Sequence, residues 1–312
     1  MTSLRSTATI ATMTALVLAA TAGCNRESSA DASQPTVVLS LSTLNNPFFV
    51  ELRDGAQAEA DAKGADLQVV DAQNDSATQA NQLQTADSAS TDAVIVNPVD
   101  SDAVGASVTA LNGSSIPVVA VDRTVTGADV ASFIASDNVA GGKQAADALA
   151  AAIGGQGQVI VLQGVAGTSA SRDRGQGFAE GIAAYPGITV VAQQTAAFDR
   201  ATALDVTTNL LQANPGVVGV FAENDEMALG AVQALGDRAG TDVQVAGFDG
   251  TTDGIAAVQA GTMVATIAQQ PGDLGKLAVD AALAAIAGDE VEATQSVEVV
   301  TVTKDNVADF AQ

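Results

Sequence analysis

Short apolar runs alternate with longer amphipathic segments from residue 36 onward. In the first half of the chain, the apolar runs lie at residues 37–42, 67–71, 93–97, 118–122 and 133–136. Runs of this length predict strands, and the segments between them have the spacing of helices. Regular alternation of strands and helices is typical of βαβ units and a parallel sheet, so the sequence predicts an α/β fold.

The same pattern begins again after residue 138. It predicts strands at residues 158–163, 189–194, 218–223, 243–248 and 264–269, and helices at 174–185, 199–212 and 225–236. A last helix at 272–287 and one closing strand at 297–303 complete the pattern. Because 312 residues suffice for two domains that each bury a core, two halves of similar order predict a duplicated α/β domain.

The first predicted helix has clear signals at both ends. Asn46 can accept hydrogen bonds from the free backbone N–H groups of the first turn, where Pro47 lacks the N–H that would go unpaired. Gly64 can adopt the left-handed conformation that ends a helix. We therefore expect a helix that starts at Asn46 or Pro47 and ends at about Lys63.

Polar side chains follow the apolar runs at matching places in the two halves. Asn97 is followed 25 residues later by Asp122, and Asn224 is followed 25 residues later by Asp249. In an open parallel sheet, the carboxyl ends of the strands line the ligand crevice. The spacing therefore predicts one pocket between two related domains.

Aromatic rings are scarce in the chain, at 3% of residues, and half of the phenylalanines lie beside predicted strand ends. These four are Phe48, Phe49, Phe198 and Phe248. A sugar has apolar C–H faces, which rings can cover, and a rim of hydroxyl groups, which Asp, Asn and Arg can bind. The mixture of residues predicts a sugar pocket more readily than a core.

Four charged residues near the same strand ends balance one another. They are Asp122, Arg123, Arg174 and Asp249. Burial of two negative and two positive groups together is tolerable when domains close around them, whereas a single buried charge is costly. Taken singly, each of these residues could equally form an exposed salt bridge.

The overall charge and the missing residue types restrict the possible chemistry. A net charge of −24, from 36 acidic and 12 basic residues, disfavours nucleic acid as a partner and is interpreted as a solvated acidic surface. The chain has no histidine and one cysteine, which excludes Ser-His-Asp and Cys-His catalysis and nearly all zinc sites. We therefore predict no catalytic residue, no metal and no cofactor.

The first 35 residues have the features of a secretory address. Arg5 precedes an apolar run at 11–20, and small residues lead to Cys24, so residues 1–23 are predicted to be a signal peptide. Residues 18–24 resemble a bacterial lipobox, although Thr21 stands where Leu is usual. Lipidation of Cys24 would attach the protein to the outer face of the cell membrane through the tether 24–35. Ordinary cleavage near Ala22 is the alternative and would leave the protein periplasmic.

Five short motifs identify the family that the chain resembles. They are STLNNPFF at 42–49, IASDN at 134–138, GVAGTSA at 164–170, NDEMALG at 224–230 and GFDGT at 247–251. Together they resemble the ribose-binding proteins of bacterial ABC importers, which belong to the type 1 periplasmic binding proteins. The resemblance extends from residue 36 to about residue 303. The chain differs from the family in its lipobox-like leader and in its loss of surface lysines.

This resemblance implies a fold and a division of the chain. The fold consists of two Rossmann-like three-layer domains, joined by a three-crossing hinge, with the ligand cleft between them. The implied N-terminal domain comprises residues 36–137 and 270–297, and the C-terminal domain comprises 138–269 and 298–312. Closure of the hinge would capture the ligand, and an ABC importer permease would recognise the closed form.

The resemblance also implies the ligand, D-ribose, and the residues that contact it. Rings would enclose the sugar from three positions, with a fourth ring adding apolar contact: Phe48, Phe49, Phe198 and Phe248. Hydrogen bonds would come from Asn46, Asn97, Asp122, Arg123, Arg174, Asn224, Asp249 and Gln269. All twelve positions carry the family residue, which favours ribose over a larger hexose. The mechanism that the resemblance implies is binding and presentation without covalent chemistry, and we expect the protein to act as a monomer.

Other functions share this architecture. A sugar-sensing subunit for a receptor kinase or chemoreceptor would use the same closed form, and another monosaccharide could occupy the pocket. Effector domains of LacI-type repressors share the fold, but they follow a helix-turn-helix and present basic surface. The predicted secretory leader and the negative charge argue against a repressor, and the missing histidine argues against an enzyme.

Overall fold

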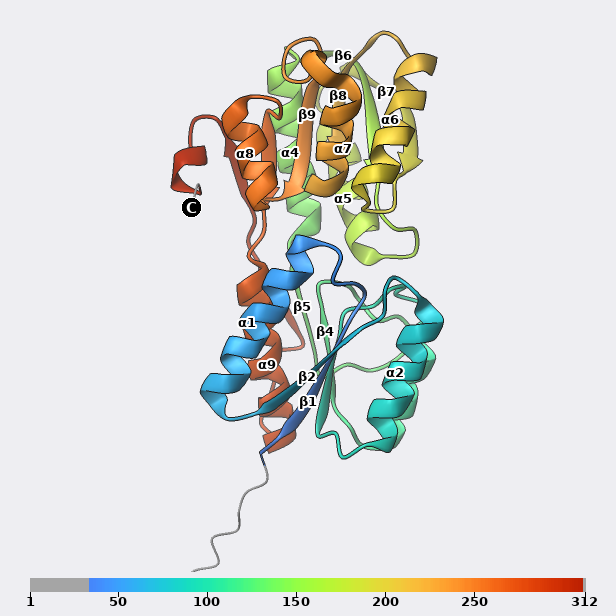
Figure 1. Ribbon diagram of the computed structural model, residues 1–312, viewed down its shortest axis with the longest axis vertical. Coiled ribbons are helices and arrows are strands. Elements are labelled where there is room, and N and C mark those ends of the chain that lie inside the picture. Colours follow the sequence, from blue (N-terminus) through green and yellow to red (C-terminus); the bar gives the residue numbers. More distant parts are fainter. Residues whose placement is uncertain (1–33, 311–312) are drawn as a thin grey trace, which may run out of the picture. The chain divides into compact units, whose positions relative to one another are not determined.

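The computed structural model describes residues 34–310, which form two α/β lobes (Figure 1). The predicted signal peptide, Cys24 and residues 25–33 of the predicted tether lie outside the described residues. Between residues 34 and 310, no helix has the length and apolar content needed to cross a membrane.

The first lobe contains a six-stranded sheet in which every pairing is parallel. The strands lie in the order β11-β5-β4-β3-β1-β2. Their bounds are β1 Thr36–Leu41, β2 Asp66–Asp71, β3 Ala93–Val96, β4 Val118–Val121, β5 Ser132–Ser136 and β11 Thr294–Val297. The helices of this lobe are α1 Pro47–Lys63, α2 Ser76–Ser88, α3 Gly105–Gly113 and α9 Pro271–Ala287.

The second lobe repeats this arrangement. Its sheet has the order β12-β10-β9-β8-β6-β7, and only the pairing of β10 with β12 is antiparallel among the described strands. The strands are β6 Gln156–Gln163, β7 Gly187–Thr195, β8 Val217–Ala222, β9 Gln244–Asp249, β10 Ala265–Ala268 and β12 Val300–Thr303. The helices are α4 Asn138–Ala152, α5 Ser169–Ile182, α6 Arg200–Ala213, α7 Asp225–Leu235 and α8 Thr252–Ala260, with short 3₁₀ turns at η1 Gly236–Arg238 and η2 Val307–Asp309.

The predicted duplicated α/β fold is confirmed. In each lobe, the first five strands lie in the spatial order second, first, third, fourth, fifth. The chain passes between the sheets after β5, after β10 and between β11 and β12. Which residues move together as a rigid domain stays a prediction.

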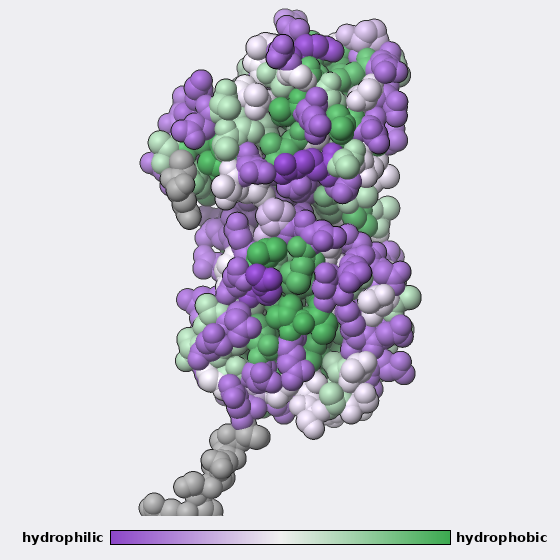
Figure 2. Space-filling view, in the orientation of Figure 1, coloured by the Kyte–Doolittle hydropathy of each residue, from purple (hydrophilic) through white to green (hydrophobic). Residues whose placement is uncertain are grey.

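Apolar side chains fill both faces of each sheet. Four clusters of buried residues occupy these faces, and they consist mainly of Val, Ile, Leu and Ala from the strands and the facing helices. Parallel strands that are covered on both sides need such continuous apolar runs, which explains the pattern in the sequence. Figure 2 shows hydrophilic and apolar residues on one face, with apolar residues visible between α1 and α2 in the first lobe and over part of the second lobe.

The predicted ends of α1 are confirmed. The side chain of Asn46 accepts a hydrogen bond from the backbone N–H of Phe48 at 2.9 Å, and Pro47 is the first helical residue. Gly64 ends the helix with φ of 71°. The cap therefore fixes the direction in which the first turn of α1 leaves β1.

Two predicted elements differ from the structure. The helix predicted at 174–185 is α5, which begins at Ser169 because Thr168 caps it by accepting from the N–H of Ser171. The closing strand predicted at 297–303 is wrong as a single strand. Residues 294–297 pair with β5 in the first sheet, whereas residues 300–303 pair with β10 in the second.

Helices α4 and α5 pack unusually closely because glycines face each other across the contact. A Cβ atom on Gly142 would lie 2.3 Å from the carbonyl oxygen of Arg174, and one on Gly177 would lie 2.1 Å from that of Val139. Backbones at this distance leave no room for a side chain. The close packing sets the position of α5, which carries Arg174.

Candidate functional site

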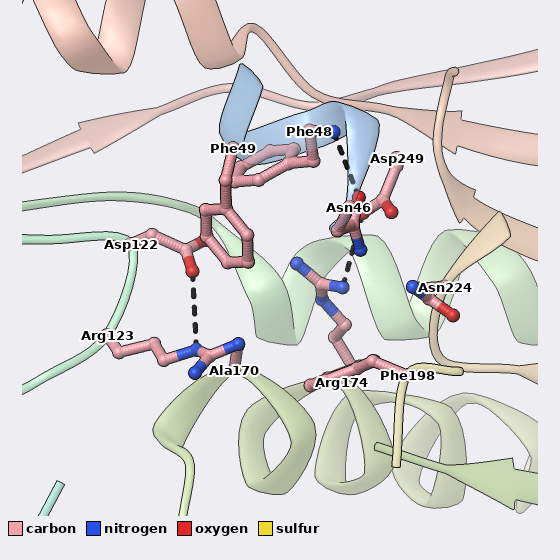
Figure 3. A pocket seen from close by; sticks show the side chains of 10 residues that line it. All are labelled: Asn46, Phe48, Phe49, Asp122, Arg123, Ala170, Arg174, Phe198, Asn224 and Asp249. Carbon is pink, nitrogen blue, oxygen red and sulfur yellow. Dashed lines mark hydrogen bonds and ion pairs between the residues drawn. The ribbon is translucent and has the colours of Figure 1, made fainter. Parts of the chain in front are cut away.

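A small cavity of about 20 Å³ lies where the carboxyl ends of both sheets meet. Residues of α1 and the loop after β4 line it from the first lobe, and residues of α5, the loop before α6 and the ends of β8 and β9 line it from the second (Figure 3). The lining residues are Asn46, Phe48, Phe49, Asp122, Arg123, Ala170, Arg174, Phe198, Asn224 and Asp249. The cavity is narrow, and side chains of both lobes line it.

The two lobes contact each other directly beside this cavity. The N–H of Ser101 donates to the carbonyl oxygen of Gly167 at 3.0 Å, and the N–H of Thr124 donates to the hydroxyl of Ser169 at 2.9 Å. Both donors belong to the first lobe and both acceptors to the second. The structure therefore has its lobes together around the pocket.

Phe48 and Phe49 form one wall from the first turn of α1. Their rings meet edge to face, with centroids 5.2 Å apart and an interplanar angle of 86°. The two rings are buried, and the guanidinium of Arg123 lies 5.3 Å from the ring centre of Phe49. The wall presents an apolar surface bordered by a positive charge.

Asp122 and Arg123 follow β4 and face the cavity from the same lobe. Asp122 has φ of 64°, and its Oδ2 accepts from Nδ2 of Asn97 at 3.2 Å. Nη1 of Arg123 donates to the carbonyl oxygen of Pro98 at 2.8 Å, and its Nε lies 3.6 Å from Oδ2 of Asp122. Asn97 and Pro98 therefore hold the two charged side chains from behind.

Arg174 occupies the corresponding place in the second lobe. Its Nε donates to Oδ1 of Asn138 at 2.8 Å, and its Nη1 donates to the carbonyl oxygen of Glu223 at 2.7 Å and to Oδ1 of Asp249 at 3.4 Å. The guanidinium also lies 4.0 Å from the ring centre of Phe248. These contacts fix the orientation of the guanidinium, which lowers the entropy cost of ordering it when a ligand binds.

Asp249 ends β9 in a strained backbone conformation. Its φ is 126°, which L residues rarely adopt, and Nε2 of Gln269 donates to its Oδ1 at 2.7 Å. Positive φ values also occur at Asp122 and at Phe198. Strained backbone conformations persist only where the surrounding structure holds them in place, and they cluster at functional sites. The three residues with positive φ in this pocket therefore indicate a functional region.

The ring of Phe198 closes the pocket opposite α1. A Cβ atom on Gly164 would lie 2.0 Å from Cζ of Phe198, so the glycine makes room for the outer end of the ring. The guanidinium groups of Arg123 and Arg174 lie 5.8 and 5.9 Å from the ring centre. Phe198 is therefore held by the glycine and by the two cations.

Burial affects the ionisation of Asp122, Arg123 and Asp249. It raises the pKa of Asp122 and of Asp249, and the neighbouring arginines oppose this effect. Burial also lowers the pKa of Arg123 to about 10, which still leaves the side chain charged at neutral pH. The pocket therefore combines arginine donors with carboxyl groups. Burial disfavours the ionised form of these carboxyl groups, and the arginines favour it.

Four buried polar atoms in and beside the pocket have no hydrogen-bond partner among the described residues. Two are acceptors, Oδ1 of Asp122 and Oε1 of Gln269, and two are donors, Nε of Arg123 and Nδ2 of Asn224. An unpaired buried polar atom costs about 1–3 kcal/mol. A ligand rich in hydroxyl groups, each of which both donates and accepts, is suited to such a set.

The structure brings nine of the twelve predicted residues to the pocket lining and places three behind it. Asn97 contacts Asp122, Gln269 contacts Asp249, and Phe248 lies under Arg174. Direct contact of these three with a ligand stays a prediction. Ala170 also lines the pocket, and the sequence carries no chemical signal for it beyond its place in the motif at 164–170.

Asp225 is a buried acid that the sequence analysis did not single out. Its carboxylate accepts from the N–H and hydroxyl of Thr251 at 2.8 and 3.0 Å, and from the hydroxyl of Thr266 at 2.7 Å. Cβ atoms on Gly247 and Gly254 would lie within 2.4 Å of its oxygens, so both glycines make room for the carboxylate. Asp225 thus joins α7 to the loop after Asp249.

The free energy of unfolding should fall as the pH rises, because the buried carboxyl group of Asp225 has a raised pKa. Burial raises its pKa to about 6 from an ordinary value of 3.8, so between these pH values the folded state binds more protons than the unfolded state. The unfolding free energy then falls by about 2 kcal/mol as the pH rises from 4 to 7. In Asp225→Asn, which keeps the shape of the side chain, this contribution should disappear. Urea unfolding of wild type and Asp225→Asn at several pH values measures the free energy of unfolding. The same change of this free energy with pH in both proteins would contradict the role of Asp225.

The fold and the site define a class of protein. Two duplicated α/β lobes in contact, with a small buried pocket of rings, charges and unpaired polar atoms at the carboxyl ends of both sheets, are typical of a binding protein for a small polar solute.

Comparison with known proteins identifies the family. Residues 37–290 match the model described as a periplasmic binding protein domain, and the chain belongs to this family. It is 47% identical to the ribose import binding protein of Escherichia coli, over 94% of this chain and 97% of that protein, and 44% identical to the one from Bacillus subtilis, over 84% and 85%. Among solved structures, an ABC transporter solute-binding protein from Actinobacillus succinogenes with bound D-allose is 34% identical, with a TM-score of 0.83 over 88% of this chain and 100% of that one.

Proposed function

We propose that this protein captures D-ribose outside the cytoplasm and delivers it to an ABC importer. The observation that carries the proposal is the pocket itself, in which buried rings and unpaired donors and acceptors suit a small polyhydroxylated ligand. The 44–47% identity to ribose import binding proteins over most of the chain supports ribose as that ligand.

The proposed contacts divide by chemistry. The rings of Phe48, Phe49 and Phe198 cover the C–H faces of the sugar, while the side chains of the two charged pairs and the two asparagines of the lining bind its hydroxyl groups. Hydrogen bonds to charged partners are the stronger ones, so the two aspartates and two arginines supply most of the affinity. Binding proceeds without covalent chemistry, and the protein acts as a monomer.

A panel of sugars tests the ligand. Calorimetric titration of the purified protein should give one-to-one binding of D-ribose, with weak or no binding of D-glucose, D-galactose and D-xylose. D-Allose is the most demanding competitor, because its pyranose ring carries the hydroxyl configuration of ribopyranose with one added hydroxymethyl group. A preference for a hexose would contradict ribose and leave the class of binding protein intact.

Membrane anchoring through Cys24 is part of the proposal. Two or three acyl chains would hold the protein on the outer face of the cell membrane, because each buried methylene stabilises attachment by about 0.8 kcal/mol. Residues 25–35 would then tether the binding body. Mass spectrometry of the protein from the membrane fraction should find a lipid-modified Cys24 at the N-terminus, and an unmodified N-terminus at another residue would exclude the anchor.

A further inference from the structure

Glu223 is a buried carboxyl group that the proposed sugar contacts do not use. It is fully buried, one residue before Asn224 of the pocket lining. Its Oε2 accepts from the N–H of Gly164 at 2.7 Å and from the hydroxyl of Ser171. Its Oε1 has no hydrogen-bond partner among the described residues and lies 2.9 Å from the place of a Cβ atom on Gly175. Burial of such a group is costly unless hydrogen bonds and a nearby opposite charge compensate it.

The partners of Glu223 are the segments that carry the second-lobe half of the pocket. Gly164 is the residue against which the ring of Phe198 lies, and Ser171 is in the first turn of α5, just after Ala170. The backbone carbonyl of Glu223 accepts from Nη1 of Arg174 at 2.7 Å. One residue therefore connects the support of Phe198, the start of α5 and the guanidinium of Arg174.

We infer that Glu223 is a positioning residue for sugar binding, and that its carboxylate form holds Phe198 and Arg174 in the binding geometry more firmly than its neutral form. The inference rests on the proposed function. A carboxylate accepts both hydrogen bonds strongly, whereas a neutral acid accepts them more weakly and must place its proton on one oxygen. The loop at Gly164 and the first turn of α5 are then less firmly held.

The surroundings of Glu223 allow this group to titrate near neutral pH. Burial raises its pKa to about 7, while the hydrogen bonds from Ser171 and Gly164 and the charge of Arg174 oppose the rise. Arg174 is the charged group on α5 that acts on it. The other acid nearby in sequence, Asp225, directs its carboxylate to Thr251 and Thr266. Protonation below pH 7 should therefore weaken binding.

The test compares pH profiles of affinity. Full-length wild type and Glu223→Gln are titrated with D-ribose from pH 5.5 to 8. Since charged hydrogen bonds exceed neutral ones by roughly 1 kcal/mol, wild type should lose about fivefold more affinity than the variant over this range. At pH 8 the variant should bind about fivefold more weakly than wild type. Glu180→Gln, which removes an exposed acid from α5, should keep the wild-type profile.

Two outcomes would overturn the inference. If Glu223→Gln keeps the wild-type affinity and pH profile, Glu223 does not position the site. If Glu223→Ala and Glu223→Gln weaken binding equally at all pH values, the residue acts by filling space and not through its charge. Failure of wild type to bind D-ribose at any pH would instead contradict the proposed function, so the two failures are distinguishable.

Discussion

Replacing Asp249 by Asn should lower the affinity for D-ribose at least about 30-fold. Asp249 accepts from Arg174 and from Gln269, and its side chain is 4% exposed, so its charge acts in a largely dehydrated site. Truncation or neutralisation of one member of a buried charged pair costs about 2–5 kcal/mol, and 2 kcal/mol corresponds to about 30-fold in affinity. The remaining guanidinium would be less well paired, and the strongest acceptor for a sugar hydroxyl would be lost.

Calorimetric titration of Asp249→Asn against Asp253→Asn measures this effect. Asp253 lies in the first turn of α8, where its side chain is 64% exposed and pairs with Arg200 at the surface. The control removes the same charge from the same lobe, so we expect its affinity to stay within about twofold of wild type. Equal affinities for both variants would place Asp249 outside the ligand contacts.

Replacing Gly177 by Ala should destabilise the protein by about 2 kcal/mol. The added methyl group would lie 2.1 Å from the carbonyl oxygen of Val139, and backbone cannot move aside as a side chain can. Overpacking of this kind costs about 1–3 kcal/mol or more, and the better helix propensity of Ala offsets only about 1 kcal/mol. Separation of α4 and α5 would also displace Arg174 and weaken sugar binding.

Thermal and urea unfolding of Gly177→Ala and Gly113→Ala test this packing. Gly113 is the last residue of α3, and a Cβ atom there would meet no heavy atom within 4 Å. Gly113→Ala should therefore be as stable as wild type or more stable by up to about 1 kcal/mol. Gly177→Ala should unfold several degrees lower. A similar change in both variants would mean that the glycine contact is unimportant.

Much of the fold could be predicted because its parallel strands are covered on both faces. Such strands need continuous apolar runs, and the runs stand out between amphipathic helices. The closing strand was predicted wrongly because the prediction used the hydrophobic pattern alone. Residues 297–303 form one pattern in the sequence, but the chain changes sheets near Val299, and a hydrophobic pattern does not say which sheet a strand joins.

The pocket could be predicted in part. Asn, Asp, Arg and Phe beside strand ends pointed to nine lining residues, because the carboxyl ends of parallel strands meet at one edge. The positioning residues were harder to find. Glu223 and Asp225 sit in the motif FAENDE, where an acid beside a helix start is equally typical of an exposed cap.

The sequence by itself determined the α/β order, the duplication and the residue types of a sugar pocket, since these depend on local patterns and on side-chain chemistry. Only the tertiary structure decided the strained backbone at Asp122 and Asp249, the separation of lining from supporting residues, and the burial of Glu223. Each of these depends on which segments meet in space. The raised pKa of Glu223 has the same origin, because it comes from burial in the folded chain. The hydrogen bonds that oppose the rise come from Gly164 and Ser171, which are 59 and 52 residues away in the chain.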